Sequence, residues 1–150
     1  MGGMGHLYEV VDSARETLHT CKSKGDWYDS MGDYITKSNK ELDTEDCLRS
    51  WAAFIPDEPY PISHLLKGEF HSENDDYWDQ PHVSFIGSNL VKEILSELKH
   101  KGKDNYENRL ISIYPSMQGE IWLYDPLCKF LESVASRNNA VIVLGSRYYL

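Results

Sequence analysis

The stretch between residues 82 and 102 constrains the fold more than any other part of the chain. His82–Ile86 is a short apolar run that predicts a buried strand, and Gly87 follows it as a turn. From Asn89 to Lys101, apolar residues recur at spacings of three and four. This pattern predicts an amphipathic helix, with Ser88 as its N-cap. A buried strand followed directly by an amphipathic helix needs other strands to pair with and a core that buries the apolar face of the helix.

The same reasoning predicts further elements on both sides of this unit. Helical spacing predicts helices over residues 12–24, 27–35, 44–55, 105–113 and 126–138, and one helical turn at 62–67. Gly25 and Pro56 are expected to end the first and third of these helices. Short β-prone runs predict strands at 6–11 and 140–144, residues 147–150 are candidates to extend the sheet, and 120–124 fits a strand or a helix start. We expect one α+β domain, helix-rich and packed around a small β-sheet.

Size and composition agree with a single domain spanning residues 1–150. The chain is 41% hydrophobic and 12% aromatic, which are ordinary globular values. Its apolar runs are too short to cross a bilayer, and we recognise no secretory signal pattern. Three widely spaced cysteines do not make a disulfide framework. We therefore expect a soluble, cytoplasmic protein whose residues 1–4 are disordered or tag-like.

The net charge of −9 limits the possible partners. An acidic chain repels phosphate backbones unless its basic residues cluster, so we expect no nucleic-acid partner and no membrane partner. The densest basic group is Lys99, Lys101 and Lys103. Their position at the end of a predicted helix is explained by the helix dipole.

Several stretches together resemble the YfbM-like family of small bacterial proteins. They are residues 61–69 (PISHLLKGE), the helix with Val91 and Leu98, the Ile113-Tyr114-Pro115 motif, and the runs 127–135 and 140–144. The resemblance covers about the last two-thirds of the chain and implies an α+β fold and a bacterial origin. The family has no settled activity to carry over. This chain departs from the family pattern at residues 72–80, which are acidic and aromatic where a glycine-containing segment is usual.

No arrangement of residues points to a catalytic centre or a cofactor. Ser88 follows a strand and a glycine, but Gly-x-Ser-x-Gly is absent. The same junction could bind an anion through backbone N–H groups, but it lacks the glycine-rich loop and lysine of a phosphate site. His71 with Glu73, Asp75 and Asp76 is the one cluster of histidine and carboxylates, and a solvated loop explains it better than a metal ion. We therefore assign no catalytic residue, metal ligand or cofactor.

Residues 57–79 carry most of the excess negative charge. Seven acids against one lysine give this segment six of the nine excess charges, and aromatic residues are interleaved with the acids. A charge run is usually a solvated loop, whereas acids beside Tyr and Trp are typical of a protein-binding surface. Burial of Trp78 beneath the loop fits the pattern equally well. The candidate partner-binding residues are Asp57, Glu58, Tyr60, Glu73, Asp75, Asp76, Tyr77, Trp78 and Asp79.

These observations favour a bacterial immunity or antitoxin-type protein. Small size, acidity and the acidic-aromatic segment suit a module that neutralises a basic toxin or effector domain by direct binding. The alternative is a small-molecule enzyme of unknown reaction that uses His64 or His71 with nearby carboxylates. A scaffold or a homo-oligomer is a third possibility, which a symmetric interface would reveal.

Overall fold

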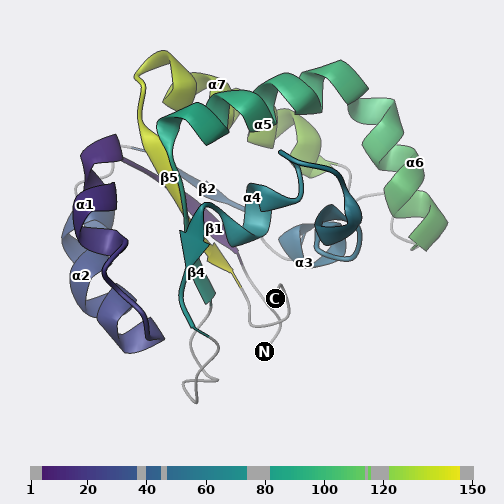
Figure 1. The fold of residues 1–150 in the computed structure, drawn as a ribbon. Coiled ribbons are helices and arrows are strands. Elements are labelled where there is room, and N and C mark those ends of the chain that lie inside the picture. Colours follow the sequence, from purple (N-terminus) through teal and green to yellow (C-terminus); the bar gives the residue numbers. More distant parts are fainter. Residues whose placement is uncertain are drawn as a thin grey trace.

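The computed structural model describes residues 5–36, 40–44, 47–73, 82–113, 115 and 122–145. It confirms the α+β class: an antiparallel sheet of five strands carries helices on both faces (Figure 1). The strands lie in the order β2-β1-β5-β4-β3. Their bounds are His6–Val10 (β1), Glu41–Asp43 (β2), Phe70–His71 (β3), His82–Ile86 (β4) and Ala140–Gly145 (β5).

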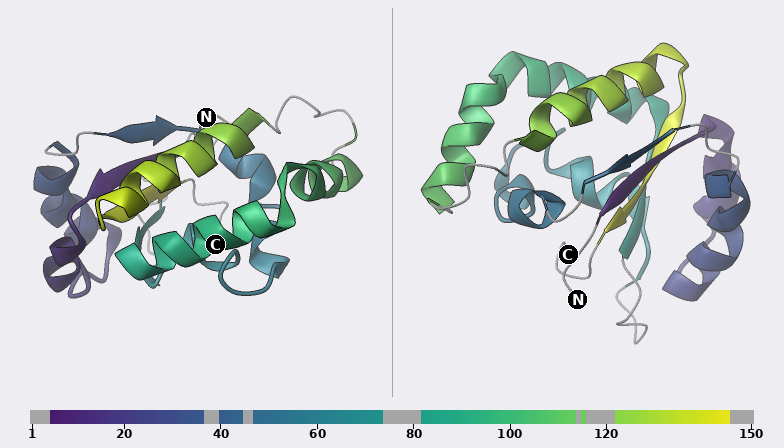
Figure 2. Two further views of the ribbon diagram at one scale, coloured as in Figure 1. Left: turned by 90° about the horizontal axis from the view of Figure 1, so that it is seen from above. Right: turned by 180° about the vertical axis from the view of Figure 1, so that it is seen from behind.

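The helices divide between the two faces of the sheet, as the views in Figure 2 show. One face is covered by α1 and α2, and the other by α5 and α7, with α3, α4 and α6 beside them. The α-helices are Arg15–Leu18 (α1), Lys24–Thr36 (α2), Cys47–Trp51 (α3), His64–Lys67 (α4), Ser88–Lys101 (α5), Lys103–Ile113 (α6) and Tyr124–Ser136 (α7). Short 3-10 helices cover Asp12–Ala14 and Ile55–Asp57.

The predicted strand at 140–144 is the centre of the sheet. Val141 and Val143 belong to the core cluster under α5 and α7, whereas Ala140 and Ile142 belong to the cluster under α1 and α2. All four side chains are at most 2% exposed. A strand buried on both faces must be apolar at every position, which explains why its sequence shows an unbroken run without alternation.

An ion pair between a buried glutamate and an exposed arginine joins β1 to the turn that leads into β5. Glu9 on β1 is 4% exposed, and its carboxylate accepts hydrogen bonds from Arg137 Nη2 at 2.6 Å and Nε at 2.7 Å. Asn139 Nδ2 donates a further bond at 2.7 Å. The bonds from Arg137, with a smaller contribution from Asn139, lower the pKa of Glu9 although its burial acts in the opposite direction. The charge of the buried Glu9 carboxylate is therefore balanced by the guanidinium of Arg137.

Some predicted boundaries are wrong. The first helical segment ends at Leu18, and α2 begins at Lys24 and passes through Gly25, the expected stop. Packing of Trp27 and Met31 into the core outweighs the low helix propensity of that glycine. Strands β2 and β3 were not predicted, because segments of two or three residues are too short to show the alternation of apolar and polar residues that indicates a strand. Residues 116–121 and 147–150 lie outside the described part of the chain.

Gly68 closes α4 and sets the path of the chain into β3. Its φ of 63° and ψ of −163° fall in a region that only glycine adopts readily. A Cβ atom there would lie 2.3 Å from the carbonyl oxygen of Phe85 in β4. The next residue, Glu69, donates its N–H to that same oxygen at 2.8 Å. The predicted end of the helix at Gly68 is confirmed, and the glycine allows β3 to approach β4.

We expect Gly68→Ala to lower the free energy of unfolding by about 3 kcal/mol or more, from backbone strain together with the clash against β4. Gly102→Ala is the matched control, because Gly102 has φ 81° and ψ 163°, and a Cβ atom added to it would meet no other atom within 4 Å. The free energy of unfolding of this variant should fall only by the backbone strain, about 1–3 kcal/mol. Urea denaturation of the two variants checks this. Equal losses would contradict the role of the close approach.

Candidate functional site

The described structure contains four of the nine candidate partner-binding residues. The side chains of Asp57, Tyr60 and Glu73 are exposed, and Glu58 is buried. Asp75, Asp76, Tyr77, Trp78 and Asp79 lie outside the described residues. The acidic-aromatic surface is therefore described at its two ends, one at the turn before α4 and the other just after β3.

Glu58 does not present its charge to the surroundings. Its side chain is 4% exposed, and its carboxylate lies 3.4 Å from Lys101 Nζ and 3.4 Å from Arg109 Nη1. The Arg109 guanidinium also sits over the Phe54 ring, 5.5 Å from the ring centre. This acid is neutralised by basic residues of the same chain, so we correct the surface by leaving Glu58 out.

Tyr60 is the most exposed large hydrophobic side chain among the described residues, at 60%. Its hydroxyl donates a hydrogen bond to Glu93 on α5, and its ring meets His64 in a T-shaped contact with centroids 5.0 Å apart. The bond to Glu93 raises the pKa of Tyr60, so the phenol stays protonated and keeps its donor. The ring is thus open to solvent and fixed in place.

The two candidate histidines contact hydroxyl and carbonyl groups. His64 Nδ1 is 3.1 Å from Ser63 Oγ, and His71 Nδ1 is 2.8 Å from the carbonyl oxygen of Ser72. Burial, and then the charge of Lys67, lowers the pKa of His64, so its imidazole is neutral near pH 7. Within the described ranges neither imidazole contacts a carboxylate, and the enzymatic alternative stays a prediction.

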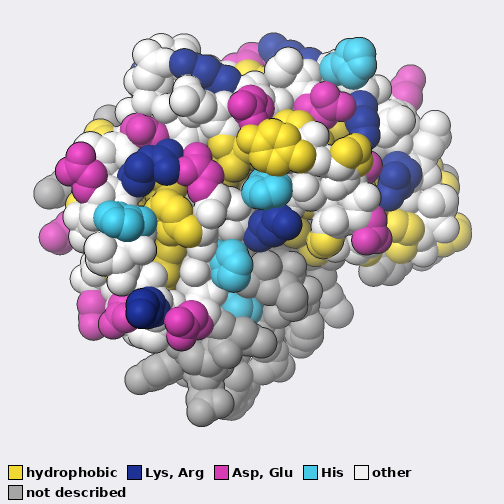
Figure 3. Space-filling model, in the orientation of Figure 1, with side chains coloured by type: hydrophobic (Ala, Val, Ile, Leu, Met, Phe, Trp, Pro, Cys, Tyr) yellow, Lys and Arg dark blue, Asp and Glu magenta, His cyan; other side chains and the backbone are white. Residues whose placement is uncertain are grey.

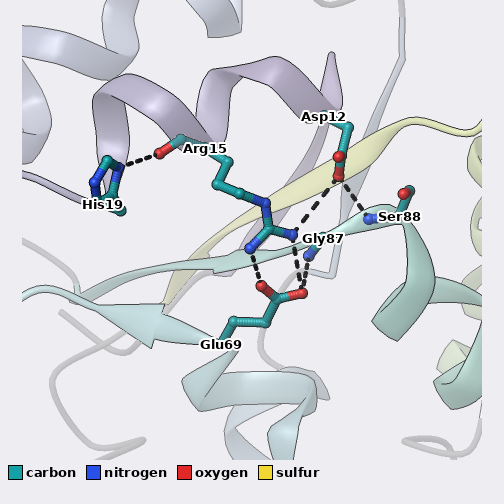
Figure 4. Close-up of polar contacts among 6 residues, drawn as sticks. All are labelled: Asp12, Arg15, His19, Glu69, Gly87 and Ser88. Carbon is teal, nitrogen blue, oxygen red and sulfur yellow. Dashed lines mark hydrogen bonds and ion pairs between the residues drawn. The ribbon is translucent and has the colours of Figure 1, made fainter.

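A charged cluster joins α1, β3 and the start of α5 (Figure 4). Arg15 forms a two-point contact with the Glu69 carboxylate and lies 3.9 Å from Asp12 Oδ1. The same two acids accept the first N–H groups of α5: Gly87 N donates to Glu69 at 3.1 Å, and Ser88 N donates to Asp12 at 2.8 Å. Hydrogen bonding to Glu69 also raises the pKa of Arg15.

This cluster corrects the prediction for Ser88. The helix begins at Ser88 with Gly87 as its cap residue, and no cap side chain bonds the helix. Asp12 and Glu69 cap it from distant parts of the chain, and they occupy the two N–H groups considered for an anion. A Cβ atom at Gly87 would lie 2.0 Å from Arg15 Nη2 and 2.4 Å from Glu69 Oε1, so the ends of these two side chains would have to move.

A shallow pocket of about 420 Å³ lies where the chain turns from α1 into α2. It is lined by Thr20, Cys21, Asp26, Asp29 and Ser30. The predicted surface reaches this region, because Glu73 N donates a hydrogen bond to the carbonyl oxygen of Lys22 at 2.7 Å. Asp26 Oδ2 accepts a hydrogen bond from Lys22 N at 3.4 Å, so its exposed carboxylate lies at this junction. The acids on α2 and Glu73 are about 45 residues apart in sequence, so no local sequence pattern could predict that these two segments meet.

The face that carries α4 mixes acidic, basic, histidine and hydrophobic side chains (Figure 3). Among the described residues, no group of three or more His, Cys, Asp or Glu side chains could hold a metal ion. No helix in the same part of the chain is long and apolar enough to span a membrane.

No protein-family model matches the sequence, and no curated protein matches it significantly. A solved structure does match: YfbM from Escherichia coli, a protein of unknown function, with a TM-score of 0.64 and 14% identity. The match covers 95% of this chain and 99% of that chain. The chain has the fold of YfbM. The resemblance seen in the last two-thirds of the sequence thus extends over nearly the whole fold, and at this identity it shows the fold alone.

We expect Glu58→Gln and Asp57→Asn, two adjacent substitutions, to differ sharply in stability. Glu58→Gln removes the charge of a buried carboxylate that is paired with Lys101 and Arg109 and should cost about 1–3 kcal/mol. Asp57 is exposed, and its loss should stay within about 0.5 kcal/mol. Urea denaturation at pH 7 measures both. If Asp57→Asn proved the more costly, the division into structural and surface acids would be wrong.

Proposed function

We propose that this protein is an acidic protein-binding module of the bacterial immunity or antitoxin type, which neutralises a basic toxin or effector domain by binding it directly. The single observation that carries the proposal is the concentration of negative charge and aromatic residues in segment 57–79. The bacterial assignment rests on the resemblance to the YfbM-like family.

The exposed acids at the two ends of this segment support the proposal. Asp57 and Glu73 contact no lysine, arginine or histidine side chain within the described ranges, in contrast to Glu58 and Glu69. Asp26, which accepts a bond from the N–H of Lys22, adds negative charge beside the Lys22–Glu73 contact. Clustered charge of one sign raises the local concentration of a partner of opposite charge.

The proposal also has a kinetic rationale. Electrostatic steering raises association rates to about 10⁸ M⁻¹s⁻¹ or more at low salt. An inhibitor of a toxin must bind before the toxin reaches its target, so a fast encounter matters as much as a slow release. Exposed aromatic rings such as Tyr60 would then supply contact area at the centre of the interface.

We expect the triple variant Asp75→Ala, Asp76→Ala, Trp78→Ala to lose capture of a basic protein encoded by the adjacent gene, because it removes charge and an aromatic anchor together. The matched control is Glu16→Ala, Asp104→Ala, Trp122→Ala, which likewise removes two acids and a tryptophan, from exposed positions elsewhere. The control should bind like the unmodified protein in a pull-down. Undiminished capture by the first variant would remove residues 74–81 from the interface.

We expect the association rate with that partner to fall about tenfold or more between low and high salt, as screening removes the steering. Asp57→Asn with Glu73→Gln should slow association at low salt and flatten the salt dependence. Glu16→Gln with Asp104→Asn, exposed acids outside the segment, is the charge-matched control. Stopped-flow or surface plasmon resonance measures the rates. Equal slowing by both pairs would show an effect of net charge alone.

A further inference from the structure

Two aromatic rings in this fold hold an arginine that is also paired with a glutamate. Arg15 lies over Phe85 at 5.3 Å and pairs with Glu69. Arg109 lies over Phe54 at 5.5 Å and pairs with Glu58. In each case the ring attracts the guanidinium; Glu69 accepts N–H groups of Arg15, and Glu58 forms an ion pair with Arg109 at 3.4 Å.

Tyr60 and Glu93 form a third pair of ring and glutamate, at the surface. The Tyr60 hydroxyl donates to Glu93 Oε2, so the carboxylate is held at the hydroxyl end of the ring. In the described part of the chain no arginine or lysine contacts Glu93 or lies over the Tyr60 ring. We propose that this pair receives an arginine side chain of the basic partner, with the guanidinium over the ring and hydrogen-bonded to Glu93. The proposal rests on the proposed function for the existence of that partner.

Two of the neighbouring lysines are engaged with other residues, whereas Lys67 is exposed near His64. Lys92, next to Glu93 in sequence, donates to Asn138 Oδ1, and Lys101 pairs with Glu58. Lys67 lies close enough to His64 to lower the pKa of that imidazole. Since His64 is neutral near pH 7, it adds no positive charge at the edge of the Tyr60 ring. The exposed carboxylate of Asp57, three residues before Tyr60, adds to the negative charge around the turn.

The ring is already ordered in the free protein. The bond to Glu93 and the T-shaped contact with His64, at 5.0 Å and 74°, fix its orientation while 60% of the residue stays exposed. Binding therefore loses little side-chain entropy on this side of the interface. Arginine fits better than lysine, because its planar, weakly hydrated guanidinium can stack on a ring and donate to a carboxylate at once.

The test uses the full chain, ¹⁵N-labelled, titrated with tetra-arginine amide and separately with tetra-lysine amide. We expect tetra-arginine to shift the amide signals of Tyr60, Ser63 and Glu93, and to bind there about two- to fivefold more tightly than tetra-lysine. NaCl at matched ionic strength gives the baseline. Shifts at these residues that equal those in NaCl, or that are the same for both peptides, would overturn the inference.

Variants separate the ring from the carboxylate. Tyr60→Leu should weaken binding at this place about two- to fivefold, and Glu93→Gln should also weaken it. Tyr60→Phe keeps the ring but loses the hydroxyl that holds Glu93, so it should fall between the unmodified protein and Tyr60→Leu. Trp122→Leu, at an aromatic residue that is 37% exposed, is the control and should bind normally. Unchanged binding by Tyr60→Leu would overturn the proposal.

Failure of this inference can be told apart from failure of the proposed function. Peptide shifts confined to other acidic residues, such as Glu73, would leave an acidic binding surface standing and remove Tyr60 from it. An absence of shifts anywhere on the protein would count against both proposals. Because Tyr60 is exposed, the Leu and Phe variants should keep the spectrum of the folded protein, which the same measurement records.

Discussion

The pairing of β5 with β1 on one side and β4 on the other is the interaction on which the rest of this structure depends. Its register runs from His6 opposite Leu144 to Val10 opposite Ala140, and from His82 opposite Gly145 to Ile86 opposite Val141. Because β5 faces both core clusters, each helix layer packs against it and against its two neighbours. The bonds of Glu9 to Arg137 and Asn139 hold the turn that leads into this strand.

Elements that bury a full face could be predicted from the sequence, and elements held by their neighbours could not. Helix α5 and strand β5 carry long apolar patterns, so residues 89–101 and 140–144 were recognised within one residue of their bounds. Strand β3 has two residues and exists because Gly68 lets it approach β4. Helix α2 contradicts the rule that a glycine ends a helix, since the buried Trp27 and Met31 stabilise the turn that contains Gly25.

The charge of the candidate surface was predicted in amount but not in location. Glu58 and Glu69 count toward the acidic segment in sequence, yet each is neutralised by an arginine 51 or 54 residues away. Conversely, Asp26 belongs to another segment and comes close to Glu73, through Lys22, only in the folded chain. A charge count along a chain ignores these long-range pairs. The pairing of Tyr60 with Glu93 also depends on the packing of the turn before α4 against α5.

The position of β5 in the chain has a consequence for synthesis. The central strand of the sheet follows the other four in sequence, so a nascent chain leaves the ribosome with β1 and β4 complete and the strand between them still missing. Until residues 140–145 emerge, both strands expose apolar side chains and open edges that can pair with other chains. This sheet can therefore close only after residues 140–145 have been translated.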